Sequence, residues 1–169
     1  METPTGPPGS GNRSTRSHRQ LTGWLAVAAQ FVAIIGIVVS PGDPALVPAA
    51  VRWAGILLIA VGGVTMVVAF LNLGSALTPT PVPVAGAGLR TAGLYARIRH
   101  PIYTGLLLLA GGLVLRSPGV WPAVWFVLLA AILTAKALWE EHMLAEAYPD
   151  YREYRRHTGR FLPRLRPVR

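Results

Sequence analysis

Two polar clusters stand beside apolar stretches in the second half of the chain. The first, "YARIRHPIYTG" at 95–105, places two arginines and a histidine directly before a proline. The second, "WEEH" at 139–142, places two glutamates shortly after a stretch, 117–135, that contains no Asp, Glu, Lys or Arg. Ionisable side chains beside membrane-type segments are costly and are usually functional. We therefore take both clusters as candidate functional residues.

The first cluster predicts a binding site for an anion at the start of a helix. Pro101 suits the first helical turn, where its missing N–H would be unpaired in any case. Free N–H groups and the positive end of the helix dipole favour a carboxylate or a phosphate there, and Arg97, Arg99 and His100 surround them. Gly105 would let a ligand approach the backbone one turn further on. The alternative is that the arginines only contact lipid phosphates.

The second cluster supplies the opposite charge. Glu140 and Glu141 are unfavourable at a helix C-terminus, because the dipole is already negative there. If the intervening apolar stretches form a helical hairpin, the acids and the anion site lie at the same end of it. S-adenosylmethionine, a small zwitterion, would match both halves, whereas NADPH would leave the acids without a role. The alternative is that the acids pair with Lys136 or Arg97.

The composition that must position these clusters is that of an integral membrane protein. Of the 169 residues, 52% are hydrophobic and only 14% are charged, against about 25% charged in soluble domains. A spanning helix needs roughly 20 mainly apolar residues. The stretches that qualify or nearly do are about 21–39, 52–73, 102–115 and 119–138. We predict an all-α integral membrane protein with about four transmembrane helices.

The positions of the basic residues predict the orientation. The net charge is +9, and almost all cations lie in the N-terminal tail, in the loop 74–101 and after the fourth span. The opposite side would hold only Arg52 and Arg116. By the positive-inside rule we expect a multi-pass protein of the cell membrane with both termini and the loop cytoplasmic. Because the charge reports topology, we expect no nucleic-acid partner.

The ends of the chain differ from its centre. Residues 1–20 are rich in Pro, Gly, Ser and Arg, so we expect a disordered basic tail, followed by one transmembrane domain, 21–169. Apolar residues after the fourth span recur at helical spacing: Trp139, Met143, Ala147, Tyr151 and Tyr154. They predict an amphipathic C-terminal helix, 140–157, at the cytoplasmic interface, which Pro149 interrupts or kinks.

The absence of cysteine excludes disulfides, thiolate nucleophiles and Cys-based metal sites. The four histidines do not show the spacing of a metal site, so we expect no metal. Methyl transfer from a sulfonium would need none.

The two clusters together resemble the isoprenylcysteine carboxyl methyltransferase family, which is grouped with the phospholipid methyltransferases. In the first cluster the resemblance rests on Gly93, Tyr95, Arg99, His100, Pro101, Tyr103 and Gly105. In the second part it rests on Glu140, Glu141, Leu144, Tyr148, Tyr151, Tyr154 and Pro163. It covers about 71–163, starting at "LNLG", and looks like the short, four-span bacterial type. The chain departs from the family at "AYPD" (147–150), where members often have an aromatic–glycine pair.

The resemblance implies an S-adenosylmethionine-dependent methyltransferase that acts on a lipophilic acceptor, an isoprenylcysteine-type carboxylate or similar. It implies that His100 and Tyr103 hold the methionine end of the cofactor, and that Glu140 or Glu141 binds its ribose or amino group. The full set of implied cofactor residues is Tyr95, Arg99, His100, Pro101, Tyr103, Gly105, Glu140 and Glu141. The implied catalytic residues are Glu140 with Arg156 and Arg160, either of which would face the acceptor.

Two other functions remain open. Membrane proteins similar to sterol reductases carry a string like "RHPIYTG", so an NADPH-dependent membrane reductase is one alternative. A non-catalytic, lipid-anchored membrane scaffold is the other, with arginines that serve only as anchors.

Overall fold

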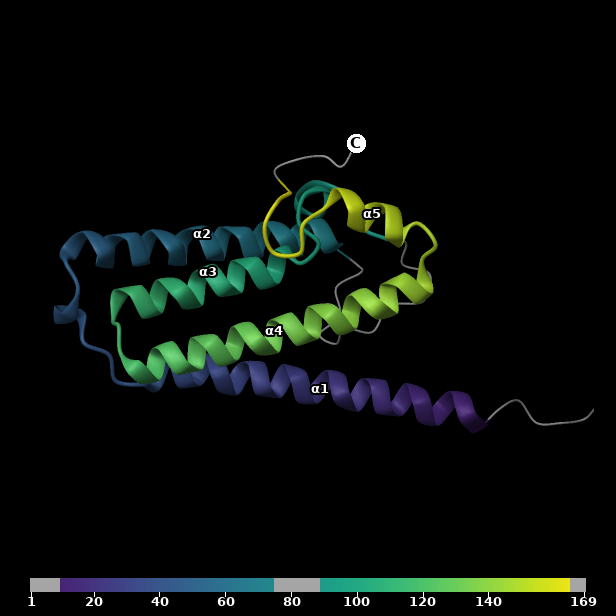
Figure 1. The fold of residues 1–169 in the computed structure, drawn as a ribbon, viewed down its shortest axis with the longest axis horizontal. Helices are drawn as coiled ribbons and strands as arrows, with labels where there is room; N and C mark the ends of the chain where they lie inside the picture. Colours follow the sequence, from purple (N-terminus) through teal and green to yellow (C-terminus); the bar gives the residue numbers. More distant parts are fainter. Residues whose placement is uncertain (1–9, 75–88, 165–169) are drawn as a thin grey trace, which may run out of the picture.

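The computed structural model describes residues 10–74 and 89–164, with side chains described from Ser17 onward, and all the elements that it describes are helical (Figure 1). The four long helices are α1 (Ser10–Val39), α2 (Ala49–Leu73), α3 (Pro101–Arg116) and α4 (Val120–Ala147). The short ones are α5 (Tyr151–His157) and the 3-10 turns η1 (Pro44–Leu46) and η3 (Gly93–Ala96). The described residues include no strand, only an isolated parallel bridge between Ile98 and Gly159.

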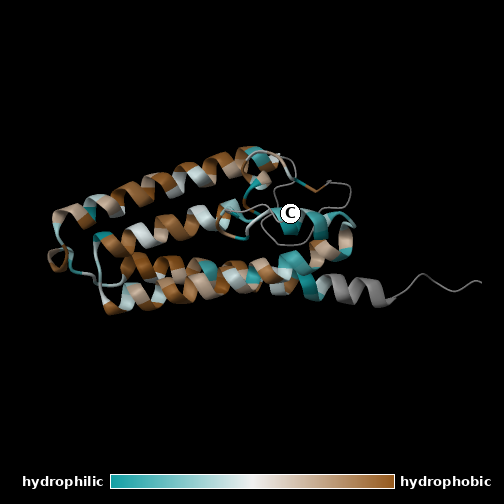
Figure 2. Ribbon diagram, turned by 45° about the horizontal axis from the view of Figure 1, so that its top comes forward, coloured by the Kyte–Doolittle hydropathy of each residue, from teal (hydrophilic) through white to brown (hydrophobic). Residues whose placement is uncertain are grey.

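Three helices are long and apolar enough to cross a membrane: 17–39 in α1, all of α2 and all of α4. The fourth, α3, is apolar but shorter. Large apolar side chains such as Leu71 and Val39 point outward and are exposed, as expected for helices that face lipid. Figure 2 shows hydrophobic residues along all four helices, with hydrophilic residues gathered at the end that carries α5. The predicted all-α membrane architecture is therefore supported by both length and polarity.

The helices pack as two pairs, α2 with α3 and α1 with α4. Between α2 and α3 the contact is backbone to backbone. A Cβ added at Gly62 would lie 2.5 Å from the Gly105 carbonyl oxygen, and one at Gly55 would lie 2.7 Å from that of Gly112. Small residues permit such close approach in membrane helices. The two glycine pairs therefore fix the position of α3 along α2.

A small apolar core joins α3 to the other pair. Its buried members are Ala33, Ile37, Leu106, Ala110, Leu129 and Leu133, from α1, α3 and α4. The core determines how α3 sits against α4, and with it how the two polar clusters face each other.

The difference in length between α3 and α4 sets the level of the polar residues. At 1.5 Å per residue, the 16 residues of α3 span about 24 Å and the 28 residues of α4 about 42 Å. Both helices meet the same short turn, Ser117–Gly119, so α4 runs on past the first residue of α3. Glu140 and Glu141 lie about one turn beyond the level of Pro101. The short helix thus leaves room for polar segments beside the end of α4.

Three expected boundaries are corrected. The acid pair lies inside α4, which continues without a break to Ala147, because 133–147 contains neither Gly nor Pro. The helix ends before Pro149, as predicted, so the C-terminal helix is only Tyr151–His157 instead of 140–157. Residues 10–20, expected to be disordered, form the first turns of α1, since no proline interrupts them. Residues 1–9 and the proline-rich part of the predicted loop, 75–88, lie outside the described residues.

The glycine contact predicts a difference between two neighbouring substitutions. Gly62→Ala should lower the free energy of unfolding by about 1–3 kcal/mol, because the new Cβ meets rigid backbone of α3. The matched control is Gly63→Ala, whose Cβ would meet no atom within 4 Å and which should be neutral or slightly stabilising. Thermal unfolding in detergent measures both. Equal effects of the two substitutions would contradict the packing argument.

Candidate functional site

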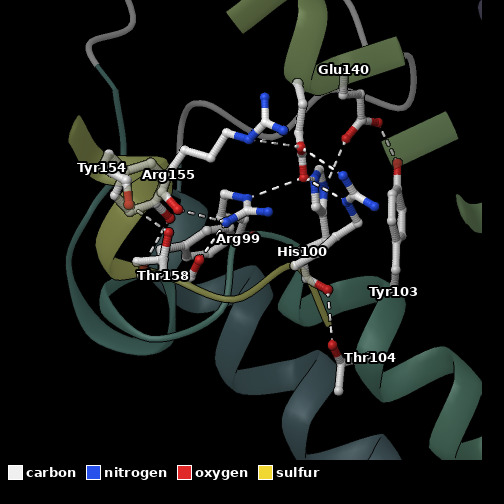
Figure 3. A network of polar contacts seen from close by, with 11 residues as sticks. Arg99, His100, Tyr103, Thr104, Glu140, Tyr154, Arg155 and Thr158 are labelled. Carbon is white, nitrogen blue, oxygen red and sulfur yellow. Dashed lines mark hydrogen bonds and ion pairs between the residues drawn. The ribbon is translucent and has the colours of Figure 1, made fainter. Parts of the chain in front are cut away.

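The two sequence clusters are in direct contact in the structure (Figure 3). They meet where the start of α3 faces the last turns of α4, at the end of the molecule that also holds α5. This is the spatial arrangement that the helical hairpin predicted.

A third segment completes the site. Residues 158–161 run beside 97–100 and are held by backbone hydrogen bonds: Arg99 N–H donates to the Gly159 carbonyl (2.8 Å), and His100 N–H donates to the Arg160 carbonyl (3.1 Å). The Thr104 hydroxyl donates to the Phe161 carbonyl (2.7 Å), which ties the segment to the first turn of α3. Sequence reasoning named only Arg160 here. The glycine in "TGRF" is a sequence signal for a tight backbone at this place. The structure shows its cause, because Gly159 leaves no room for a Cβ.

Glu141 is the centre of the polar network. Its carboxylate accepts hydrogen bonds from Arg99 Nε (3.1 Å) and, through both oxygens, from Arg160 Nε (2.8 Å) and Nη2 (3.1 Å). His100 Nε2 lies 3.3 Å from the same carboxylate. The Glu141 side chain is only 3% exposed. Because its oxygens are surrounded by cations of this chain, Glu141 positions the other residues and has little capacity for a ligand.

Arg99 joins this carboxylate to the C-terminal segment. Besides Glu141, its guanidinium donates to the carbonyls of Arg155 (3.2 Å) and Thr158. Arg155 itself is farther from the acid, with its Nε 4.0 Å from Glu141, and its side chain is mostly exposed.

Glu140 is different from its neighbour. It accepts a hydrogen bond from the Tyr103 hydroxyl on one oxygen, and its other oxygen lies 3.2 Å from His100 Nδ1. The side chain is 17% exposed. A carboxylate has about four acceptor positions, so Glu140 can accept further hydrogen bonds from a ligand. The structure thus separates the roles of the two acids that the sequence could not tell apart.

His100 lies between the two carboxylates and stacks against Tyr103, with ring centroids 5.4 Å apart. Burial lowers the pKa of His100, but its contact with Glu140 and the negative charges of Glu140 and Glu141 raise it more, so its pKa lies above the ordinary value. The Nε2 atom of His100 is close to Glu141 but is not aligned for a hydrogen bond with it. In the described part of the chain this buried nitrogen therefore has no hydrogen-bond partner. The Tyr151 hydroxyl is likewise buried and has no hydrogen-bond partner among the described residues.

Tyr95 of η3 and Tyr154 of α5 join these two elements beside the site. The Tyr154 hydroxyl donates to the Tyr95 carbonyl (2.6 Å), and burial raises the pKa of Tyr154 to about 12. Burial likewise raises the pKa of the Tyr95 hydroxyl. Both hydroxyls are therefore neutral, and Tyr95 contributes packing between η3 and α5 instead of charge.

Three of the predicted site residues take no part in the polar network. Gly105 is buried against α2, where a Cβ would meet Met66 Cγ at 2.6 Å and the Gly62 carbonyl oxygen at 2.7 Å, so a ligand cannot approach its backbone. Pro101 is the first residue of α3, as expected, but is buried. Arg156 is 73% exposed and pairs with Glu153 (3.7 Å), apart from the network. Glu141 pairs with Arg99 and Arg160, and among the described residues neither acid pairs with Arg97, whose side chain is exposed.

The network has more positive than negative groups. Its permanent cations are Arg99, Arg155 and Arg160, against the carboxylates of Glu140 and Glu141, and His100 lies between the two acids. The described residues contain no group of His, Asp or Glu able to hold a metal ion. The arrangement can hold an organic anion near the arginines and hydrogen-bond donors near Glu140.

Comparison with known proteins identifies the family. The family description "Phospholipid methyltransferase" matches residues 50–151, which include α2, α3 and α4 with both polar clusters. The chain belongs to the phospholipid methyltransferase family. The suspected family is thereby confirmed, and methyltransferase activity in general is what membership implies. The C-terminal segment that closes the site lies outside the matched range.

The chain is also similar to part of one curated protein. The chain is 39% identical over 79 residues to "Cobalt-zinc-cadmium resistance protein CzcN" of Cupriavidus metallidurans, which covers 46% of this chain and 36% of that protein. The chain thus matches only about a third of the relative's length.

The burial of Glu141 predicts a large effect of a small change. Glu141→Gln should lower the free energy of unfolding by about 3–5 kcal/mol, because Arg99 and Arg160 would lose their buried counter-charge. Glu153→Gln is the matched control, since its partners are exposed and its loss should cost at most about 1 kcal/mol. Chemical or thermal unfolding in detergent compares them. A similar small effect of both would show that Glu141 does not hold the segments together.

The raised pKa of His100 predicts how stability depends on pH. Its protonated form adds stability that is fully present below the unfolded-state pKa of about 6.5, and this contribution is lost as the pH rises through the folded-state pKa. The unfolding temperature of the wild type should therefore fall more than that of His100→Asn when the pH is raised from mildly acidic to mildly alkaline. Parallel curves for the two proteins would refute a charged His100.

Proposed function

We propose that this protein is an integral membrane methyltransferase that uses S-adenosylmethionine and methylates a lipophilic acceptor. The observation that carries the proposal is the contact of the two polar clusters at one end of the α3–α4 hairpin. There, Glu140 keeps free acceptor positions beside a network with excess positive charge.

The residues present fit the chemistry of this cofactor. S-adenosylmethionine supplies a methyl group made electrophilic by the positive sulfonium. Its carboxylate matches the cationic side of the network, where the Nε2 donor of His100 has no hydrogen bond. Its ammonium and ribose hydroxyls are donors, and Glu140 is the acid with acceptor positions to spare. Tyr103 and His100 would hold Glu140 in place through the contacts that they already make.

The chain's own residues would act mainly by positioning. Orientation alone can lower the barrier of a bimolecular step substantially. Arg160 uses its Nε and Nη2 to bind Glu141, its side chain is 28% exposed, and its remaining N–H groups can orient a carboxylate acceptor. A carboxylate is already nucleophilic and needs no base. For an amine acceptor, Glu140 is the base candidate. Arg156, being outside the network, is the weaker of the two arginines proposed for the acceptor.

The acceptor is proposed to be lipid-tailed, an isoprenylcysteine-type carboxylate or a similar molecule. The polar network lies beside helices whose outer faces are apolar, and Leu138, two residues before Glu140, is half exposed. An acceptor with an apolar tail could stay in the bilayer while its polar end reaches the site. A water-soluble acceptor would not use these faces.

We further propose that the site lies on the cytoplasmic side of the cell membrane. The first turns of α1, the end of the 89–100 segment and α5 all lie at the end that holds the site (Figure 1). An ion pair between Arg19 and Glu146 (3.4 Å) joins the first part of α1 to α4. These segments carry most of the described arginines, which is the distribution expected for cytoplasmic ends.

Calorimetry in detergent separates the candidate functions. The wild type should bind S-adenosylmethionine and S-adenosylhomocysteine, and Glu140→Gln should weaken binding of the former about tenfold or more through the loss of a charged hydrogen bond. Glu146→Gln, an exposed acid on the same helix, is the matched control and should bind normally. Binding of NADPH alone would identify a reductase, and binding of none of the three would favour a scaffold.

Methyl transfer itself is tested with labelled cofactor. Purified protein in vesicles with a prenylcysteine analogue, or with a phospholipid amine, should transfer label to one of these lipids, and the Glu140→Gln protein should not. Binding of the cofactor without transfer to any lipid-tailed acceptor would overturn the proposed substrate class while leaving the cofactor assignment intact.

A further inference from the structure

A second polar opening lies at the other end of the helices. A cavity of about 510 Å³ is formed between the end of α1, η1, the start of α2 and the end of α3. Its polar walls are Ser40, Arg52, Arg116 and Ser117. These arginines are the two that the charge pattern placed on the side away from the tail, and nothing in the methyltransferase site requires them.

The two arginines are brought together by the glycine packing of α2 and α3. A Cβ at Gly55 would lie 3.0 Å from the backbone nitrogen of Arg116, so this part of α3 rests directly on α2. Arg52 stands one turn before Gly55 on the same helix and lines the same cavity. The backbone contact fixes the two helix positions from which Arg52 and Arg116, both exposed, line the same cavity, and two guanidinium groups at one cavity favour an anion.

Neither arginine has a partner among the residues that the structure describes. In the described ranges, Arg52 and Arg116 make no ion pair or hydrogen bond through their side chains. None of the described residues that line the cavity is acidic. The carboxylate of the nearby Asp43 accepts the Ala45 N–H as the cap of η1. A ligand with a net negative charge therefore matches the cavity better than a zwitterion, whose cation would meet no acid.

The remaining walls of the cavity are apolar. Trp53, Ile56 and Leu113 line it together with the end of α1. Trp53 and the arginines stand at helix ends, where aromatic and basic residues meet the membrane–water interface. Arginines that merely anchor the helices would contact bulk headgroups. Here they face a cavity with both polar and apolar walls, which is the form of a site for one amphiphile.

We propose that this cavity binds one anionic phospholipid. Its phosphate lies between Arg52 and Arg116, with the serine hydroxyls as further donors, and the upper part of an acyl chain lies along Ile56 and Leu113. The cavity is at the opposite end of α3 from His100, about 24 Å away along the helix. The proposal does not depend on the methyltransferase assignment, since its test measures lipid bound to the protein and not activity.

Native mass spectrometry of the full chain in detergent tests this site. The probes are dioleoylphosphatidylglycerol, dioleoylphosphatidylcholine and inorganic phosphate. The wild type should retain one phosphatidylglycerol in preference to phosphatidylcholine. Arg52→Gln and Arg116→Gln should each raise its Kd about tenfold or more, because each removes a charged hydrogen bond.

Two further variants separate this site from general attraction of anionic lipid. Arg152→Gln removes an exposed arginine of α5 and should leave the Kd unchanged. Ile56→Trp keeps both cavity arginines but fills the apolar wall, and it should weaken the lipid without affecting the fold seen by circular dichroism. An equal loss in Arg152→Gln, no preference over phosphatidylcholine, no effect of Ile56→Trp, or binding of inorganic phosphate as tight as that of the lipid would each overturn the proposal.

Discussion

The buried carboxylate of Glu141 is the group on which the organisation of this protein's polar end depends. Arg99 and Arg160 reach it from two segments far apart in sequence, and His100 lies against it. A charge in such a position is stable only when its partners satisfy it. The same carboxylate therefore holds the start of α3, the end of α4 and the segment after α5 in one arrangement.

That arrangement needs helices of unequal length. Because α3 is short, α4 extends beyond the first residue of α3. The polar segments 89–100 and 158–164 occupy the space beside this last part of α4. The glycine pairs between α2 and α3 keep α3 at this level. Packing in the apolar part of the molecule thus decides where charged residues meet, although none of the glycines touches a polar group of the site.

The neighbouring acids of "WEEH" have different surroundings in the structure. Glu141 is enclosed by cations and serves as a structural centre, whereas Glu140, with Tyr103 at one oxygen and His100 at the other, keeps the capacity to bind a ligand. Consecutive residues on a helix point in directions about 100° apart, which is enough to place one in the network and the other at its edge. Membership of the phospholipid methyltransferase family gives this edge its proposed role in binding the methyl donor.

The sequence by itself determined the class of protein, the four apolar helices, the break before Pro149 and the meeting of "RIRHP" with "WEE". Hydropathy, charge placement and proline each act locally, and a hairpin necessarily brings its two ends together. Only the tertiary structure decided which acid is buried, that Gly105 serves packing against α2, and that Arg160 and not Arg156 joins the network. Those outcomes depend on which face of each helix is turned inward and on a C-terminal segment that folds back across the start of α3. Such contacts are set by packing between distant segments, which no local pattern of residues encodes.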